Sequence, residues 1–145
     1  MLSIYPACFY KEADGQYSVI FPDLDNLSTC GSNLGEAMAM AIDCLAGYLK
    51  WCSEDGTPVP EPSPLSTIDP IAIAKEIDPD DTSCEAFVNM VSVDVEAYAK
   101  EHFDKSVKKT LTIPSWLNTA ALEAGINFSQ TLKEALMAKL KIQSN

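Results

Sequence analysis

The sequence is poor in the residues and patterns that catalytic and metal sites require. It contains one histidine and five cysteines in 145 residues, and no two cysteines form a close Cys-x-x-Cys pair. It has no glycine-rich phosphate loop, no metal-ligand spacing, and no histidine placed with a serine or cysteine as in a catalytic triad. We therefore predict that the chain is not an enzyme and that it uses no metal ion and no cofactor.

Long apolar runs and targeting signals are also missing. No apolar run approaches the roughly 18 residues that a helix needs to span a bilayer, and the first residues, MLSIYP, do not resemble a signal peptide. An odd number of cysteines without close pairs is typical of a reducing compartment. The sequence thus predicts a cytoplasmic protein with no membrane role.

Basic residues are scarce and unevenly distributed. Residues 1–104 contain 4 lysines and 19 acidic residues, a net charge of −15, whereas residues 105–145 contain 6 lysines and 2 acidic residues, a net charge of +4. An acidic body favours a basic partner and disfavours DNA, while a basic segment suits phosphates. Solubility alone is an alternative explanation for the acidic part.

The N-terminal part predicts a three-stranded meander followed by a helix. Residues 2–10 and 17–21 form a hairpin through Asp14-Gly15, and residues 27–30 form a short third strand. Asn33-Leu34-Gly35-Glu36 fits a capping box that opens an amphipathic helix over residues 34–53. The helix is predicted to cover the sheet.

The middle of the chain is harder to interpret. Prolines at alternate positions over residues 58–64 predict an extended connection along the surface, with a peptide ligand for another domain as the alternative. Residues 71–77 are too short and mixed to assign, and residues 86–95, apolar on both faces, suggest an interior strand. His102, near Asp104 in a predicted connector over residues 97–105, is better explained as an exposed residue than as a proton-transfer or metal site.

Residues 106–145 predict a strand, a helix, a tight turn and a second helix. The strand, residues 106–114, alternates Val107, Lys109, Leu111 and Ile113 with Ser106, Lys108, Thr110 and Thr112. So small a segment cannot bury a core alone, and a lone strand leaves both edges unpaired, so we expect an intertwined homodimer. Two such strands would form an antiparallel ribbon.

A two-stranded ribbon fits the DNA major groove. It would place Lys108, Thr110 and Thr112 of each copy against base edges. Backbone N–H groups at Asn127, Phe128 and Ser129 could hold a phosphate at the start of the second helix, and Lys133 and Lys141 could add phosphate contacts. The alternative is a solvated strand face on a small helical unit.

Two family resemblances follow from these motifs. Residues 107–140 resemble the ribbon-helix-helix repressors in the alternating strand, the Ile-Pro junction and the Gly-Ile-Asn-Phe-Ser turn. Residues 3–95 resemble HicB antitoxins in Tyr5-Pro6-Ala7, the Asp-Gly hairpin, Phe21-Pro22-Asp23-Leu24, the cap over 31–37 and the run Pro58-Val59-Pro60-Glu61-Pro62. Asp25-Asn26 departs from the family pattern, which usually has Pro-Gly there.

The resemblance implies an α+β fold. It divides the chain into a β-β-β-α-β domain over residues 1–96 that resembles part of an RNase H fold, a connector over 97–105, and a DNA-binding and dimerisation domain over 106–145. Nuclease activity is not expected, because two-metal hydrolysis needs converging carboxylates and the first strand has none.

The resemblance also implies two activities. The chain would inhibit a HicA-type toxin, a small basic ribonuclease that cuts messenger RNA, with Asp23 and Asp25 at the border of the docking surface. It would also bind operator DNA as a dimer and repress its own operon. The alternative is a repressor whose N-terminal domain senses a small molecule, with Met38, Met40 and Cys44 lining the pocket.

Overall fold

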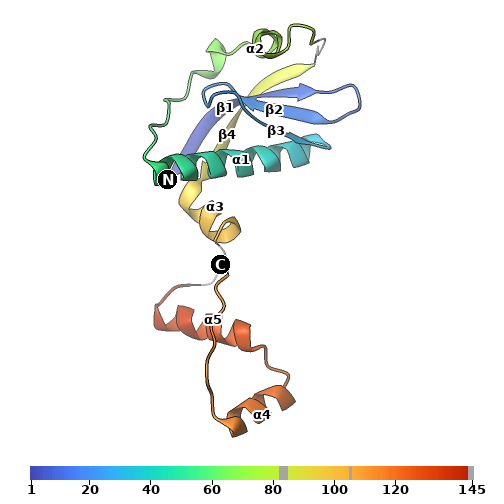
Figure 1. Cartoon of the computed structure of the whole chain (residues 1–145). Coiled ribbons are helices and arrows are strands. Elements are labelled where there is room, and N and C mark those ends of the chain that lie inside the picture. The colour runs from blue at the N-terminus through green and yellow to red at the C-terminus, as the bar shows by residue number, and fades with distance from the viewer. Residues whose placement is uncertain (82–84, 105, 144–145) are drawn as a thin grey trace. The chain divides into compact units, whose positions relative to one another are not determined.

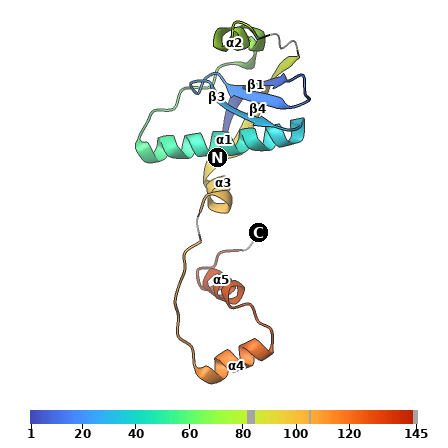
Figure 2. The ribbon, with the colours of Figure 1, turned by 45° about the vertical axis from the view of Figure 1, so that its right-hand side comes forward.

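The computed structural model describes residues 1–81, 85–104 and 106–143. The chain divides into two compact units, Met1–Lys105 and Ser106–Asn145, and each is described by itself. Figure 1 shows the first unit as a sheet with helices on both faces and the second as two helices preceded by an open segment, and Figure 2 gives a rotated view.

The sheet of the first unit is antiparallel throughout. Strands β1 (Leu2–Lys11), β2 (Tyr17–Phe21) and β3 (Leu27–Gly31) form the predicted meander, and β4 (Ala86–Asp94) pairs with β1, which gives the order β3-β2-β1-β4. The β1–β2 turn places Gly15 at φ +89°, a conformation that glycine adopts without strain. The predicted hairpin and third strand are thus confirmed.

The prediction that residues 86–95 form an interior strand is wrong, because β4 lies at the edge of the sheet. Both faces of β4 are apolar for a different reason. Val91 and Val93 join the core under one face, while Val88 packs on the opposite face against the cluster that contains Ala74. Helices on both faces, and not flanking strands, explain the composition of β4.

Helix α1 (Leu34–Asp55) covers one face of the sheet, as predicted. Asn33 Oδ1 accepts from the N–H of Glu36 at 3.0 Å, and the Glu36 carboxylate accepts from the N–H and hydroxyl of Ser32, which lowers the pKa of Glu36. The helix buries Ala41, Leu45 and Leu49 against the strands. Each fully buried leucine or phenylalanine stabilises the fold by roughly 1.5–3 kcal/mol.

The close fit between β3 and α1 requires a glycine at position 31. A Cβ atom built on Gly31 would lie 2.3 Å from the backbone nitrogen of Ala37, which is far inside van der Waals contact. The chain therefore passes from β3 into α1 through a turn that no larger residue can occupy without moving the helix.

The segment between α1 and β4 forms a surface strap and two short helices. Residues 57–64 are neither helix nor strand and are followed by η1 (Leu65–Thr67) and α2 (Pro70–Ile77). Asp69 caps α2 by accepting from the N–H groups of Ile71 and Ala72, with Pro70 in the first turn. Helix α2 packs on the face of the sheet opposite α1, around Cys8 and Tyr10.

Most of the predicted connector is helical. Helix α3 (Val95–His102) packs on α1, where the Tyr98 hydroxyl donates to Asp43 at 3.1 Å and Phe103 contacts the core. His102 is exposed and its ring stacks on Tyr98 with centroids 4.0 Å apart. The first compact unit thus extends through α3 to Lys105.

The second unit contains the two predicted helices, α4 (Ser115–Glu123) and α5 (Phe128–Lys139). Pro114 precedes α4, Gly125 follows it at φ +68°, and Asn127 caps α5. None of the described residues of this unit is buried, so the two helices form no closed core within one chain.

Candidate functional site

The predicted DNA-reading segment, residues 106–114, is exposed along its whole length. It has no strand assignment in the single chain, since a β-ladder needs a partner and the rest of the described unit is helix or turn. Lys108, Thr110 and Thr112 are therefore accessible, while the pairing predicted for them requires a second chain. The ribbon stays a prediction.

Leu111 and Ile113 of the same segment line a groove of about 610 Å³ between the segment and both helices. Lys109 also lines this groove, in keeping with its place in the alternation. Its main apolar residues are Leu111, Ile113, Leu117, Ala121, Phe128 and Leu132. Leu111 remains 63% exposed and Phe128 41% exposed, so the groove is open to a further protein segment.

The start of α5, where the sequence predicts a phosphate-binding site, is a capped helix N-terminus. Asn127 Oδ1 accepts from the N–H of Gln130 at 3.0 Å, and the Thr131 hydroxyl donates to the carbonyl of Asn127. The N–H groups of Phe128 and Ser129, in the first turn, have no intrahelical acceptor. Lys133 is exposed one turn further along, so a phosphate oxygen here would meet N–H donors and a cation on one helix.

The two predicted toxin-binding carboxylates have different environments. Asp23 is half-buried and accepts from the N–H of Ser63 at 2.8 Å and from its hydroxyl at 2.6 Å, so it holds the strap of residues 57–64 against the sheet. Asp25 is exposed, on a turn where Asp25 and Asn26 have φ values of +53° and +56°. Only Asp25 presents a freely accessible carboxylate.

No local sequence pattern indicates how the strap is fixed. Besides the Asp23–Ser63 contact, the Tyr5 hydroxyl donates to the carbonyl of Pro60 at 2.7 Å, and burial raises the pKa of Tyr5. These partners are 40 and 55 residues apart, and no local pattern connects them. The alternating prolines predict that this segment is extended, but they do not predict which residues hold it against the sheet.

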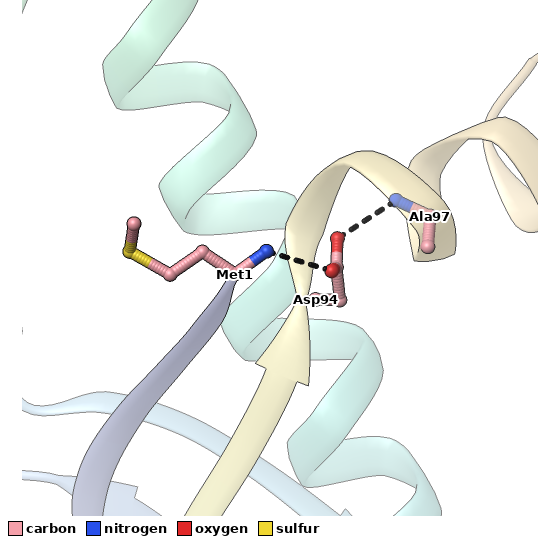
Figure 3. Close-up of polar contacts among 3 residues, drawn as sticks. All are labelled: Met1, Asp94 and Ala97. Carbon is pink, nitrogen blue, oxygen red and sulfur yellow. Dashed lines mark hydrogen bonds and ion pairs between the residues drawn. The ribbon is translucent and has the colours of Figure 1, made fainter.

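A second contact joins the start of β1 to α3. The amino group of Met1 donates to Asp94 Oδ2 at 2.9 Å, while Asp94 Oδ1 accepts from the N–H of Ala97 at 3.1 Å (Figure 3). The hydrogen bond from the amino group is the main cause of the lowered pKa of Asp94, and the same bond raises the pKa of the amine. The sequence indicates that Asp94 is the N-cap of the helix that begins at Val95. No sequence pattern predicts its bond to Met1.

The residues suggested for a small-molecule pocket do not converge. Met38 packs against the core, Met40 is 41% exposed, and the Cys44 thiol lies 3.9 Å from the carbonyl of Ser28 at the β3 edge. Among residues 1–81, 85–104 and 106–143, no three histidine, cysteine or acidic side chains are grouped to hold a metal ion. Within the same ranges, no helix is both long enough and apolar enough to cross a membrane.

Comparison with known proteins assigns the family. A family model described as "HicB_like antitoxin of bacterial toxin-antitoxin system" matches residues 4–74. A chain of the toxin–antitoxin complex from Streptococcus pneumoniae is 36% identical, with 96% of this chain and 99% of that chain covered at a TM-score of 0.61. The chain belongs to the HicB-like antitoxin family.

Two curated HicB proteins each match about half of the chain. Antitoxin HicB 1 of Photorhabdus laumondii subsp. laumondii is 32% identical over 76 residues, which cover 50% of this chain and 49% of that protein. Antitoxin HicB of Escherichia coli strain K12 is 32% identical over 78 residues, covering 50% of this chain and 56% of that protein. The chain thus spans about half the length of these HicB relatives, and the family model ends within α2.

The departure of this HicB-like chain at residues 25 and 26 has a structural consequence. Proline cannot adopt the φ of +53° observed at Asp25, because its ring fixes φ near −65°. A HicB loop with Pro-Gly at these positions must follow another backbone path. Asp25 and Asn26 tolerate the left-handed region better than most residues do, which explains how this turn adopts its two positive φ values.

Proposed function

We propose that this HicB-like chain is an antitoxin with two separate binding surfaces. Its acidic N-terminal unit binds and occludes a HicA-type toxin that cleaves messenger RNA. Its C-terminal unit forms a ribbon-helix-helix dimer that binds operator DNA and represses the operon. The observation that carries the proposal is the match along almost the whole chain to a chain of a toxin–antitoxin complex, combined with opposite charges in the two parts of the sequence.

The charge of the N-terminal part supports a basic protein partner. Residues 1–104 have a net charge of −15, and such a surface attracts a cationic ribonuclease over a Debye length of about 10 Å at 0.1 M salt. A docked acidic domain would exclude RNA from the same cationic surface. Asp25, exposed on its turn, is the carboxylate that we place at the border of the interface.

Toxin binding is tested by co-expressing the chain with the product of the neighbouring gene. We expect a complex that survives purification, suppresses RNA cleavage and weakens as salt increases. Asp25→Lys should weaken the complex, and Glu76→Lys, an equal charge change at an exposed position of α2, is the matched control. Asp23 is unsuitable for this test because its substitution would also release the strap. Equal affinity of both variants and wild type would remove Asp25 from the interface.

The exposed groove of the second unit supports dimerisation through this unit. Eleven large apolar side chains from Val107 to Ile142 are exposed, including Leu111, Trp116 and Leu140 at 63%, 72% and 69%. Exposed apolar surface this dense is unusual for a monomer. Pairing of the 106–114 segments of two chains would cover the groove and form the ribbon.

The ribbon would then read DNA through Lys108, Thr110 and Thr112. Thr110→Ala and Thr112→Ala should relax sequence preference, each good base contact contributing about 1–3 kcal/mol. Lys133→Ala should weaken binding to all sequences and reduce the salt slope by about one charge. Lys100→Ala, an exposed lysine on α3, is the control. Unchanged specificity of the threonine variants in a gel-shift series would refute the ribbon assignment.

A further inference from the structure

The C-terminal end of α1 presents an aromatic pair to solvent. Trp51 is 53% exposed, and its ring contacts that of the half-buried Tyr48, with the ring centroids 6.2 Å apart. Three other residues already attach this part of the helix to the rest of the unit, since Leu45, Leu49 and Cys52 are buried. Trp51 is therefore not needed to hold α1 in place, and a tryptophan of this exposure is typical of a protein-binding surface.

The strap and the β2–β3 turn meet at the same end of α1. The strap begins where α1 ends, as Figure 1 shows. Asp23 in the turn accepts from the N–H and hydroxyl of Ser63 in the strap, and the Tyr5 hydroxyl donates to the carbonyl of Pro60. These contacts tie the two segments to each other and to β1.

Two exposed carboxylates lie on these segments, Asp25 on the turn and Glu61 on the strap. Burial is the largest cause of the raised pKa of Tyr48, and the nearby charge of Asp25 adds to it. Burial is likewise the largest cause of the raised pKa of Tyr5, and the charge of Glu61 follows. We call the surface formed by Asp25, Tyr48, Trp51 and Glu61 the aromatic corner.

The end of α1 is also electrostatically suited to a cation. A helix C-terminus carries a partial negative charge, so lysine or arginine is favoured in the last turn. The last turn of α1 instead contains Glu54 and Asp55 and no basic residue. Lys50, one turn earlier, pairs with Glu54 at 3.1 Å and so offsets only one of these charges. A cationic side chain from another molecule would therefore lower the electrostatic energy of this end of the helix.

We propose that the aromatic corner is the docking point of a basic protein, with an arginine or lysine side chain of that protein on the ring of Trp51. The face of a tryptophan ring binds cations better than other aromatic side chains do, and Asp25 and Glu61 supply opposite charge beside it. Tryptophan, tyrosine and arginine also dominate the binding energy of protein interfaces. This role of Trp51 rests on the proposed function, because the basic partner is the toxin, and it gives the interface an aromatic centre beside Asp25.

Charge distinguishes this partner from other molecules that could cover an exposed tryptophan. A second copy of the chain would bring another body with a net charge of −15 over residues 1–104. The phosphates of a nucleic acid would meet the same carboxylates. Both would be repelled, and more strongly at low salt. Of these molecules, only a cationic partner binds more tightly as the ionic strength falls.

The first test is fluorine NMR of the full chain labelled with fluorotryptophan. Its two tryptophans are Trp51 and Trp116, and the variants Trp51→Phe and Trp116→Phe assign their signals. Addition of the unlabelled product of the neighbouring gene should shift the Trp51 signal. It should also remove the difference of this signal between light and heavy water, because the ring loses contact with solvent. The Trp116 signal should not change, since Trp116 belongs to the second unit.

The second test is the affinity of variants for the same gene product. Trp51→Ala should weaken the complex by about 30-fold or more, as truncation of a central interface tryptophan does. Trp51→Phe keeps a ring face and should weaken the complex less. Leu34→Ala, which shortens an exposed apolar side chain at the opposite end of α1, is the matched control and should leave the affinity unchanged. Circular dichroism checks that each variant keeps the fold of the wild type.

The two proposals can fail separately. If the gene product binds wild type and Trp51→Ala equally tightly, the aromatic corner is not the docking point, while the antitoxin proposal stands. If the gene product does not bind the wild type, the antitoxin proposal falls, and the peptide tetra-arginine then replaces the toxin as the probe. A shift of the Trp51 signal alone that disappears at about 1 M salt would uphold the cation site. An unmoved Trp51 signal, or one that changes with the concentration of the chain itself, would overturn it.

Discussion

The two units of this chain reach stability by different routes. The first buries side chains such as Phe9, Phe21 and Leu45 completely between its sheet and α1, whereas the second buries none of its described residues. The first carries nearly all of the acidic residues, and the second is basic. A unit with its own core can act as an independent binding body, whereas the second unit would gain a core only through the dimerisation that we propose.

The largest expected effect lies in the core of the first unit. Leu45→Ala should lower the free energy of unfolding of this unit by about 2–5 kcal/mol, because Leu45 is fully buried and leaves a cavity. The two tryptophans provide separate reporters, Trp51 on α1 and Trp116 on α4. In the Trp116→Phe background, urea unfolding followed by Trp51 fluorescence measures the effect.

The control for this substitution is Leu122→Ala in α4. Leu122 is 62% exposed and does not line the groove, so its loss should change stability by no more than about 0.5 kcal/mol. Trp116 fluorescence in the Trp51→Phe background measures the urea unfolding of the second unit in this variant. A similar loss for both leucines would mean that the second unit has a core of its own, contrary to the comparison.

The junction between β3 and α1 should show the next largest effect. Gly31→Ala should destabilise the first unit by about 1–3 kcal/mol or more, since the added methyl group meets the backbone of Ala37. Gly47→Ala is the matched substitution with the opposite sign. A Cβ at Gly47 lies 3.8 Å from Phe103, an ordinary contact, and alanine is favoured by up to about 1 kcal/mol within a helix. Thermal unfolding should show a lower Tm for Gly31→Ala and a higher Tm for Gly47→Ala than for the wild type.

Protein concentration should change the stability of the second unit but not that of the first, with a smaller effect than the substitutions above. If the second unit folds only as a dimer, a tenfold dilution costs its folded state about 1.4 kcal/mol. The Trp116 transition in urea should shift with concentration, while the Trp51 transition should not. A Trp116 transition that is independent of concentration would show that the second unit is stable in a single chain.

Elements with strong local signals could be predicted from the sequence. The Asp-Gly turn gave the β1–β2 hairpin, Asn33 and Glu36 marked the start of α1, and Gly125 and Asn127 marked the turn between α4 and α5. Each of these signals acts over a few residues, so it does not depend on the rest of the fold. Helix α2 was missed because eight residues are too few for periodicity to decide, although Asp69-Pro70 was a usable start signal.

Features that depend on distant partners could not be predicted. The edge position of β4 was missed because its second apolar face is covered by α2, which had not been assigned. The contact between Asp23 and Ser63 was not predicted, because no local pattern connects the two residues. The strand predicted over residues 106–114 needs a second chain. In each case the deciding partner lies elsewhere in the chain or in another molecule.

The smallest effect concerns the contact between Met1 and Asp94. The lowered pKa of Asp94 means that its contribution is complete above its ordinary pKa of 3.8 and is lost as the pH falls through the lowered value. The raised pKa of the Met1 amine means that its contribution is complete below 8.0 and is lost as the pH rises through the raised value. Asp94→Asn should therefore destabilise the first unit most between about pH 4 and pH 8.

The measurement for Asp94→Asn is the urea midpoint, reported by Trp51 across this pH range in protein without an N-terminal tag. Glu76→Gln, an exposed substitution on α2, controls for the removal of one negative charge. The Trp116 transition should be unaffected, because Met1, Asp94 and α3 all belong to the first unit. If Asp94→Asn shifted both urea midpoints equally, the contact at α3 would also stabilise the second unit, and the two units would not unfold independently.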